Sequence, residues 1–140
     1  MRKTTLAAIG LLATALTCGY SQAATETFKG TLSGAAEVPP VTTAATGTAT
    51  VAFDPATKMI TYNVTYSGLS GPAAAAHIHC GALAGANSGV AVPFPNAASP
   101  ISGTATLTDA QAADLEAGKC YVNVHTADNK GGEIRAQLTK

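Results

Sequence analysis

Residues 46–67 read TGTATVAFDPATKMITYNVTYS and predict two β-strands joined by a tight turn. Apolar and polar residues alternate from Ile60 to Tyr66, which is the pattern of a strand with one buried and one solvated face. Asp54 and Pro55 open the turn, with proline at the position that a type I turn favours. Similar short patterns on both sides of this segment are typical of an antiparallel sandwich or barrel.

The remaining strand signals are separated by glycine and proline. Strands are expected at 28–32, 46–53, 59–67, 75–80, 90–92, 101–107, 119–125 and 133–138. Residues 37–40 (EVPP) cannot lie in a central strand, because two prolines remove two ladder donors. One short helix is expected after Thr108, which forms a capping box with Gln111, and Gly118 ends it. The predicted fold class is therefore all-β with one short helix.

The composition indicates one domain of ordinary size, because the chain has 140 residues, 46% of them hydrophobic and 11% charged. Eight basic residues balance eight acidic ones. The chain therefore offers no positive surface for a nucleic-acid backbone or an anionic membrane, and we expect no nucleic-acid partner.

Residues 1–23 have the features of a secretory signal peptide. Arg2 and Lys3 supply the positive start, residues 6–16 the apolar stretch and residues 21–23 a small-x-small cleavage site. An apolar stretch of about 11 residues is shorter than the roughly 20 that a membrane-spanning helix needs. We expect a mature domain at 24–140 in the periplasm or secreted from a bacterium, with no membrane insertion after signal cleavage.

Cys18 lies inside this leader and raises the alternative of a lipoprotein anchor. Thr17 precedes it where a lipobox usually has a smaller residue, so Cys18 is expected to be discarded. Cys80 and Cys120 then remain, and an even pair in an oxidising compartment favours a disulfide, with two free thiols as the alternative.

All three histidines lie in the same two expected strands as these cysteines. Because side chains alternate along a strand, His77 and His79 face away from Cys80, and His125 faces away from Cys120. If the cysteines are bonded through the apolar interior, all three imidazoles point outward.

Two histidines at i and i+2 on a strand have Cα atoms about 6.5 Å apart, so their rings can converge on one ion. With His125 from a neighbouring strand, His77 and His79 would complete a three-nitrogen metal site suited to copper, with zinc a less favoured ion. A fourth position would stay open to water or a ligand. The alternative is that these are surface histidines bonded to carbonyl groups.

Two acidic residues have candidate roles near this site. Glu133 is expected close to His125 across the last hairpin, where it would orient an imidazole from the second shell of the metal, or else be a solvated edge charge. Glu37 would anchor its proline-rich loop onto Arg135, or else be an exposed loop acid. No nucleophile elbow, Walker loop or dinucleotide fingerprint occurs, so no catalytic residue is predicted.

The order of short motifs along the chain resembles the CHRD domain, a family named for chordin and widespread in secreted bacterial proteins. The motifs are FKGTLSG at 28–34, EVPP at 37–40, GTA at 47–49, AHIH at 76–79, YVNVHT at 121–126 and GGEIR at 131–135. The resemblance spans about residues 27–138. It implies an antiparallel, immunoglobulin-like Greek-key sandwich or barrel used outside the cytoplasm, in a family with no general biochemical activity established.

The two histidine strands are also similar to those of Cu,Zn superoxide dismutases, which hold copper with four histidines in an antiparallel barrel. That similarity implies His77 and His79 as paired ligands and His125 as the late one, whereas the bridging histidine and the zinc ligands have no counterpart. Three functions stay open. They are a non-catalytic extracytoplasmic binding module holding copper, a copper-only superoxide-dismutase-like oxidoreductase, and a structural domain that binds an unknown protein partner without metal.

Overall fold

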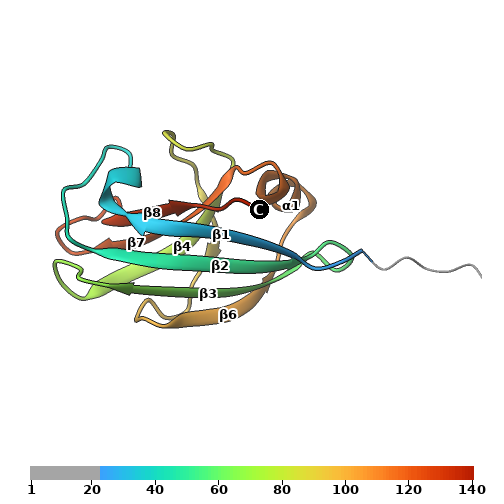
Figure 1. Ribbon diagram of the computed structural model, residues 1–140, viewed down its shortest axis with the longest axis horizontal. Helices are drawn as coiled ribbons and strands as arrows, with labels where there is room; N and C mark the ends of the chain where they lie inside the picture. The colour runs from blue at the N-terminus through green and yellow to red at the C-terminus, as the bar shows by residue number, and fades with distance from the viewer. Residues whose placement is uncertain (1–22) are drawn as a thin grey trace, which may run out of the picture.

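The computed structural model describes residues 23–140 as one antiparallel β domain (Figure 1). The elements are β1 (Glu26–Ser33), the 3-10 turn η1 (Gly34–Ala36), β2 (Thr46–Asp54), β3 (Met59–Ser67), β4 (Ala73–Cys80), β5 (Val90–Pro93), β6 (Ile101–Thr106), α1 (Asp109–Glu116), β7 (Cys120–Thr126) and β8 (Ile134–Gln137). The predicted all-β fold with one short helix is confirmed. The predicted signal peptide lies almost entirely outside the described residues.

The eight strands form one sheet in the order β5-β4-β7-β8-β1-β2-β3-β6, with every neighbouring pair antiparallel. In Figure 1, β1, β2, β3 and β6 lie side by side in front of β4 and β7. The sheet is therefore folded over on itself, with the apolar core between its two halves.

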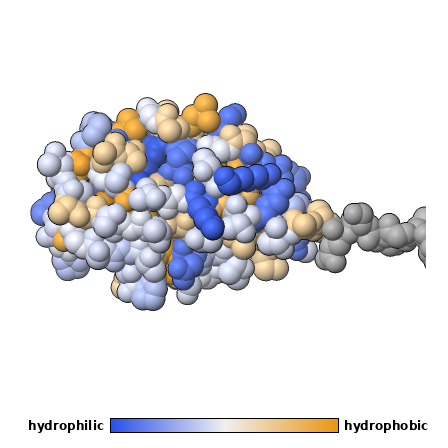
Figure 2. All heavy atoms as spheres, in the orientation of Figure 1, coloured by the Kyte–Doolittle hydropathy of each residue, from blue (hydrophilic) through white to orange (hydrophobic). Residues whose placement is uncertain are grey.

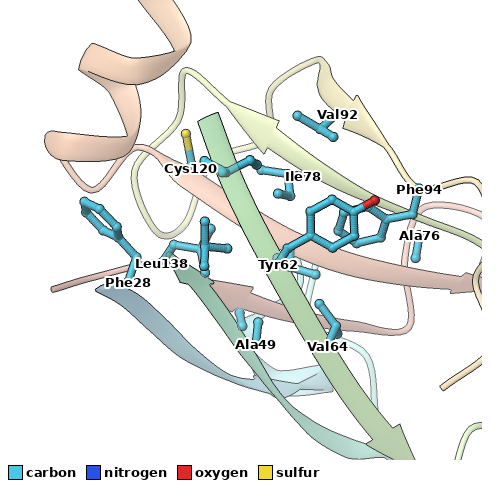
Figure 3. Close-up of a cluster of buried hydrophobic side chains, with 14 of the residues drawn as sticks. Phe28, Ala49, Tyr62, Val64, Ala76, Ile78, Val92, Phe94, Cys120 and Leu138 are labelled. Atoms are coloured by element: carbon cyan, nitrogen blue, oxygen red, sulfur yellow. The ribbon is translucent and has the colours of Figure 1, made fainter. Parts of the chain in front are cut away.

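Alternating side chains build this core from both halves. On β3, Ile60, Tyr62 and Val64 are buried and the residues between them are exposed, as the sequence pattern predicts. The Tyr62 ring stacks on Phe94 with the centroids 4.4 Å apart, and both rings reach the interior from opposite sides of the core (Figure 3). On the outward face of β1–β3, most residues are coloured white to blue, the neutral to hydrophilic part of the scale (Figure 2). The apolar side chains of these strands therefore point inward.

The halves meet where β1 lies beside β8. These strands pair at Ser33 and Arg135, and a single bridge joins Lys29 to Thr139. A Cβ atom on Gly30 would lie 2.5 Å from the Gln137 carbonyl oxygen. Only glycine allows the two backbones to approach this closely. The contact holds β8 beside β1, at the junction of the two halves of the sheet.

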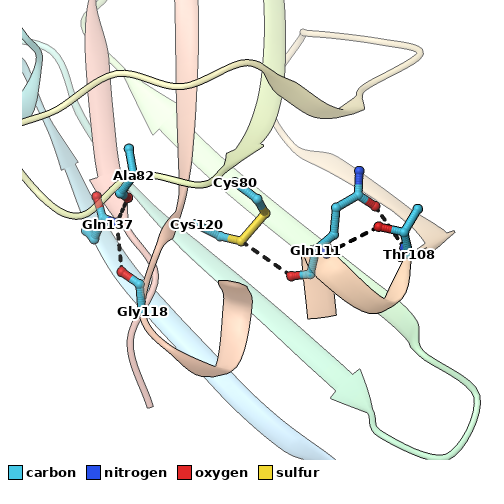
Figure 4. Close-up of a disulfide and its surroundings, with 7 residues drawn as sticks. All are labelled: Cys80, Ala82, Thr108, Gln111, Gly118, Cys120 and Gln137. Atoms are coloured by element: carbon cyan, nitrogen blue, oxygen red, sulfur yellow. Dashed lines mark hydrogen bonds between the residues drawn. A yellow bond between two sulfur atoms is a disulfide. The ribbon is translucent and has the colours of Figure 1, made fainter. Parts of the chain in front are cut away.

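The helix follows the predicted capping signals. The Thr108 hydroxyl accepts from the Gln111 amide at 3.2 Å, and the Gln111 side chain accepts from the Thr108 amide at 2.9 Å (Figure 4). Gly118 has φ +71°, a conformation that favours glycine at a helix end. The observed β8 spans Ile134–Gln137 and is one residue shorter at each end than predicted, although the amides of Glu133 and Leu138 still donate to β7 carbonyl oxygens.

A disulfide joins Cys80 and Cys120, which are directly paired residues of β4 and β7 (Figure 4). The predicted cysteine pairing is therefore confirmed, and the free-thiol alternative is wrong. Among residues 23–140, no helix has the length and apolar character to cross a membrane.

Candidate metal centre

The three histidines meet on the outward face of the β4–β7 pair. β4 and β7 are neighbours, with His79 opposite Tyr121 and Ala75 opposite His125. Ile78, between the two β4 histidines, is buried in the core. Both conditions that the sequence analysis required, adjacent strands and outward imidazoles, are therefore met.

The ring nitrogens of this cluster come within reach of a single ion. One candidate ligand atom from each of His77, His79 and His125 lies within 4.8 Å of the others. His77 Nδ1 and His125 Nε2 are 3.1 Å apart. Two nitrogens bound to the same tetrahedral zinc-sized ion, each at about 2.0–2.1 Å from it, would be about 3.3 Å apart. The pair is thus close to the separation that shared coordination requires.

Backbone carbonyls fix the orientation of two of the rings. His79 Nδ1 lies 2.9 Å from the Ser88 carbonyl oxygen, and His125 Nδ1 lies 2.9 Å from that of Lys130. A carbonyl only accepts hydrogen bonds, so each Nδ1 carries the proton and each Nε2 keeps a lone pair. Metal-binding histidines in proteins are commonly held in this way.

The electrostatic environment favours neutral imidazoles. Burial lowers the pKa of His77, and the neighbouring His125 and His79 lower it further. Burial also lowers the pKa of His125, against the opposing effect of the hydrogen bond to Lys130. Because metals bind the neutral ring, these directions keep the lone pairs available near pH 7.

Burial is uneven across the cluster. His79 is only 8% exposed, and its Nε2 is buried with no hydrogen-bond partner among residues 23–140. His77 and His125 are partly exposed. A bound ion would therefore be enclosed on the His79 side and open to solvent on the other.

Glu133 differs from both expectations. It is fully buried, so it is not a solvated edge charge. Its carboxylate accepts hydrogen bonds from the Ser70 amide and from the side chains of Thr43, Ser70, Thr126 and Asn129. Glu133 therefore connects three loops by hydrogen bonds and does not orient an imidazole. The Lys130 carbonyl oxygen, not Glu133, accepts the hydrogen bond from His125. Burial acts to raise the pKa of Glu133, but the hydrogen bonds from Ser70, Thr43 and Thr126 outweigh it and lower the pKa to about 2.

Glu37 is also buried, so the exposed-acid alternative is wrong. Burial raises its pKa to about 7, against the lowering effects of the Arg135 charge and the Asn123 side chain. Its Oε1 atom has no hydrogen-bond partner in the described chain, and it does not form a contact ion pair with Arg135 there. Gly132, whose backbone passes over this oxygen, has φ +122°, a conformation that favours glycine.

Polar residues beside the histidines are buried, which the sequence does not indicate. Tyr121, Asn123 and Arg135 point outward from β7 and β8, yet each is at most 3% exposed. The loop after β4 covers part of this face and is held there by Gln137, which donates to the carbonyl oxygen of Ala82 at 2.8 Å (Figure 4). Strand alternation places such residues on the outer face, but it carries no signal that a distant loop will cover them.

This fold and this cluster together define an all-β domain with a three-imidazole candidate metal centre. The family model for the CHRD domain matches residues 28–138, which include both histidine strands. The chain belongs to the CHRD domain family, as its motifs predict. A search of curated proteins and a search of solved structures found no match.

Proposed function

We propose that this protein is a non-catalytic extracytoplasmic binding module that holds one copper ion through His77, His79 and His125. The observation that carries the proposal is the convergence of one ring nitrogen from each histidine within 4.8 Å, beside the buried His79 Nε2, which has no hydrogen-bond partner among the described residues. A buried nitrogen lone pair without a partner has an unfavourable free energy that a metal ion would relieve.

The donor set favours copper over other ions. Both cysteines of residues 23–140 are in the disulfide, so this part of the chain offers no thiolate to the cluster. Imidazoles alone suit copper and zinc, and a given nitrogen site generally binds Cu(II) more tightly than Zn(II). We therefore assign copper, with zinc the weaker competitor.

The disulfide supports a location in the periplasm or outside the cell, since such bonds persist in oxidising compartments. This fits the leader sequence of residues 1–23.

The open side of the cluster favours one second candidate, the superoxide-dismutase-like oxidoreductase. Partly exposed His77 and His125 leave room for a small molecule beside a bound ion. Superoxide turnover by the copper-loaded protein distinguishes this enzyme from a binding module, which would show none above free copper.

The experiment is a Cu(II) titration of the exported, oxidised protein, with electron paramagnetic resonance to count the coordinating nitrogens. We expect one copper per chain with about three imidazole nitrogens. Single His→Ala variants at 77, 79 and 125 should each weaken binding, whereas Thr61→Ala, at an exposed position of β3 in the other half of the sheet, should not. Unchanged affinity in all three histidine variants would overturn the proposal.

A further inference from the structure

Three side chains from adjacent strands stack beside the histidine cluster. The His79 ring lies parallel to the Tyr121 ring, with an interplanar angle of 1° and centroids 4.8 Å apart. The Arg135 guanidinium carbon lies 3.5 Å from the centroid of the Tyr121 ring. Because β4 and β8 flank β7 on opposite sides, the phenol ring is enclosed between an imidazole and a cation.

The stack is buried. His79 is 8% exposed, Tyr121 2% and Arg135 1%. Arg135 also donates to the side chains of Asn87 and Gln137 and to the Leu83 carbonyl oxygen. These contacts fix the guanidinium in place, so it supports the phenol ring as a rigid surface.

One backbone carbonyl connects the phenol to the imidazole. The Ser88 carbonyl oxygen accepts from His79 Nδ1 at 2.9 Å and from the Tyr121 hydroxyl at 3.3 Å. The Ser88 amide donates to the same hydroxyl at 3.1 Å. Tyr121 thus contacts His79 through its ring face and also holds the loop residue that fixes the His79 tautomer.

The geometry points to Tyr121 as a positioning residue of the metal site, which sets the His79 ring with Nε2 facing the other two histidines before any ion binds. This inference rests on the proposed metal-binding function. A ligand already held in its binding rotamer loses little side-chain entropy when the metal arrives, so the stack should increase metal affinity. Neither His77 nor His125 has a comparable aromatic support among residues 23–140.

The test compares Tyr121→Leu, which removes the stacking ring, with Tyr121→Phe, which keeps the ring and removes the hydroxyl. Outer residues that orient metal ligands typically contribute 10- to 100-fold in affinity. We expect Tyr121→Leu to lower Cu(II) affinity by about that factor, and Tyr121→Phe to lower it by about threefold or less. Tyr66→Phe is the matched control, because its hydroxyl bonds to the Ala97 carbonyl outside the cluster.

A metal-free measurement keeps the inference testable if Tyr121→Leu does not fold. Nuclear magnetic resonance of the unloaded wild-type protein should show contacts between the His79 and Tyr121 ring protons and a single Nδ1–H tautomer for His79. Their absence, or a folded Tyr121→Leu variant with wild-type affinity, would overturn the positioning role. If the wild-type protein binds no copper, the proposed function fails instead, so the two failures are distinguishable.

Discussion

His77 Nδ1 and His125 Nε2 lie 3.1 Å apart although the residues are 48 positions apart in the chain. Pairing of β4 with β7 alone creates this contact. In the metal-free protein His77 Nδ1 donates to His125 Nε2, whose ring carries its proton on Nδ1, and in a metal complex both nitrogens would bind the ion. The two nitrogens therefore have a favourable interaction in either state, a hydrogen bond without the metal and shared coordination with it.

The first prediction concerns this pair. His77→Ala and His125→Ala should each lower Cu(II) affinity by at least about tenfold, and the double variant should lose little more than the worse single variant. The reason is that two nitrogens binding one ion act as a unit. Competition titrations against a copper chelator measure the affinities. Wild-type affinity in either single variant would contradict coordination of one ion by both rings.

The second prediction concerns the disulfide. Cys80→Ala/Cys120→Ala should lower the free energy of unfolding by about 3–4 kcal/mol in the chain-entropy model, because the bond closes a loop across 40 positions. Metal affinity should fall as well, since the bond holds His79 and Tyr121 at the paired end of β4 and β7. Urea unfolding of the oxidised protein, the reduced protein and the variant checks the first part. The reduced protein should match the variant, and equal stability of all three would contradict the prediction.

The third prediction concerns Glu37 and the stability of the protein between acid and neutral pH. Its folded pKa of about 7 lies above its ordinary value of 4.5. Its contribution to stability is therefore fully present below pH 4.5 and is lost as the pH rises through 7. Glu37→Gln should remove this loss, so its stability relative to wild type should improve by up to about 3 kcal/mol between pH 4.5 and pH 8.

Urea unfolding of the wild-type protein and Glu37→Gln at several pH values measures this difference. Glu116→Gln is the control, because it makes the same chemical change at an exposed position on α1. A stability difference between Glu37→Gln and wild type that stays constant with pH would refute the prediction.

Glu133 should behave in the opposite sense. Its folded pKa of about 2 lies below the ordinary 4.5, so its contribution is present above pH 4.5 and is lost as the pH falls towards 2. Glu133→Gln should destabilise the protein at pH 7 by at least about 2 kcal/mol, because a neutral amide leaves buried donors poorly paired. The difference in the free energy of unfolding between Glu133→Gln and wild type should become smaller as the pH is lowered. Urea unfolding followed by circular dichroism at several acid pH values measures this difference. A difference that grows as the pH falls would contradict the lowered pKa of Glu133.

Much of the framework could be predicted from local sequence. The alternation from Met59 to Ser67 fixes β3, and the Thr108–Gln111 pair fixes the start of α1. Side chains alternate along a strand, so the histidines lie on the opposite face from the cysteines. This places His77, His79 and His125 on one face. These features depend on backbone geometry within a few residues, which the sequence displays directly.

The environments of the buried acids and of Arg135 could not be predicted in this way. Glu133 takes hydrogen bonds from Thr43 and Ser70, which are 90 and 63 positions away. Arg135 is covered by a loop whose Leu83 is 52 positions from it. Such contacts form only when distant loops pack against the folded sheet. No periodic pattern in the sequence predicts them.

The parallel stack of Tyr121 on His79 also has an optical consequence. The sequence contains no tryptophan, so the ultraviolet emission of the protein comes from its few tyrosines. A paramagnetic ion on His79 would lie one ring away from the Tyr121 chromophore and would quench its fluorescence, while Tyr66 is held on the Ala97 loop. The domain thus contains a built-in spectroscopic reporter of its own histidine cluster, without any added label.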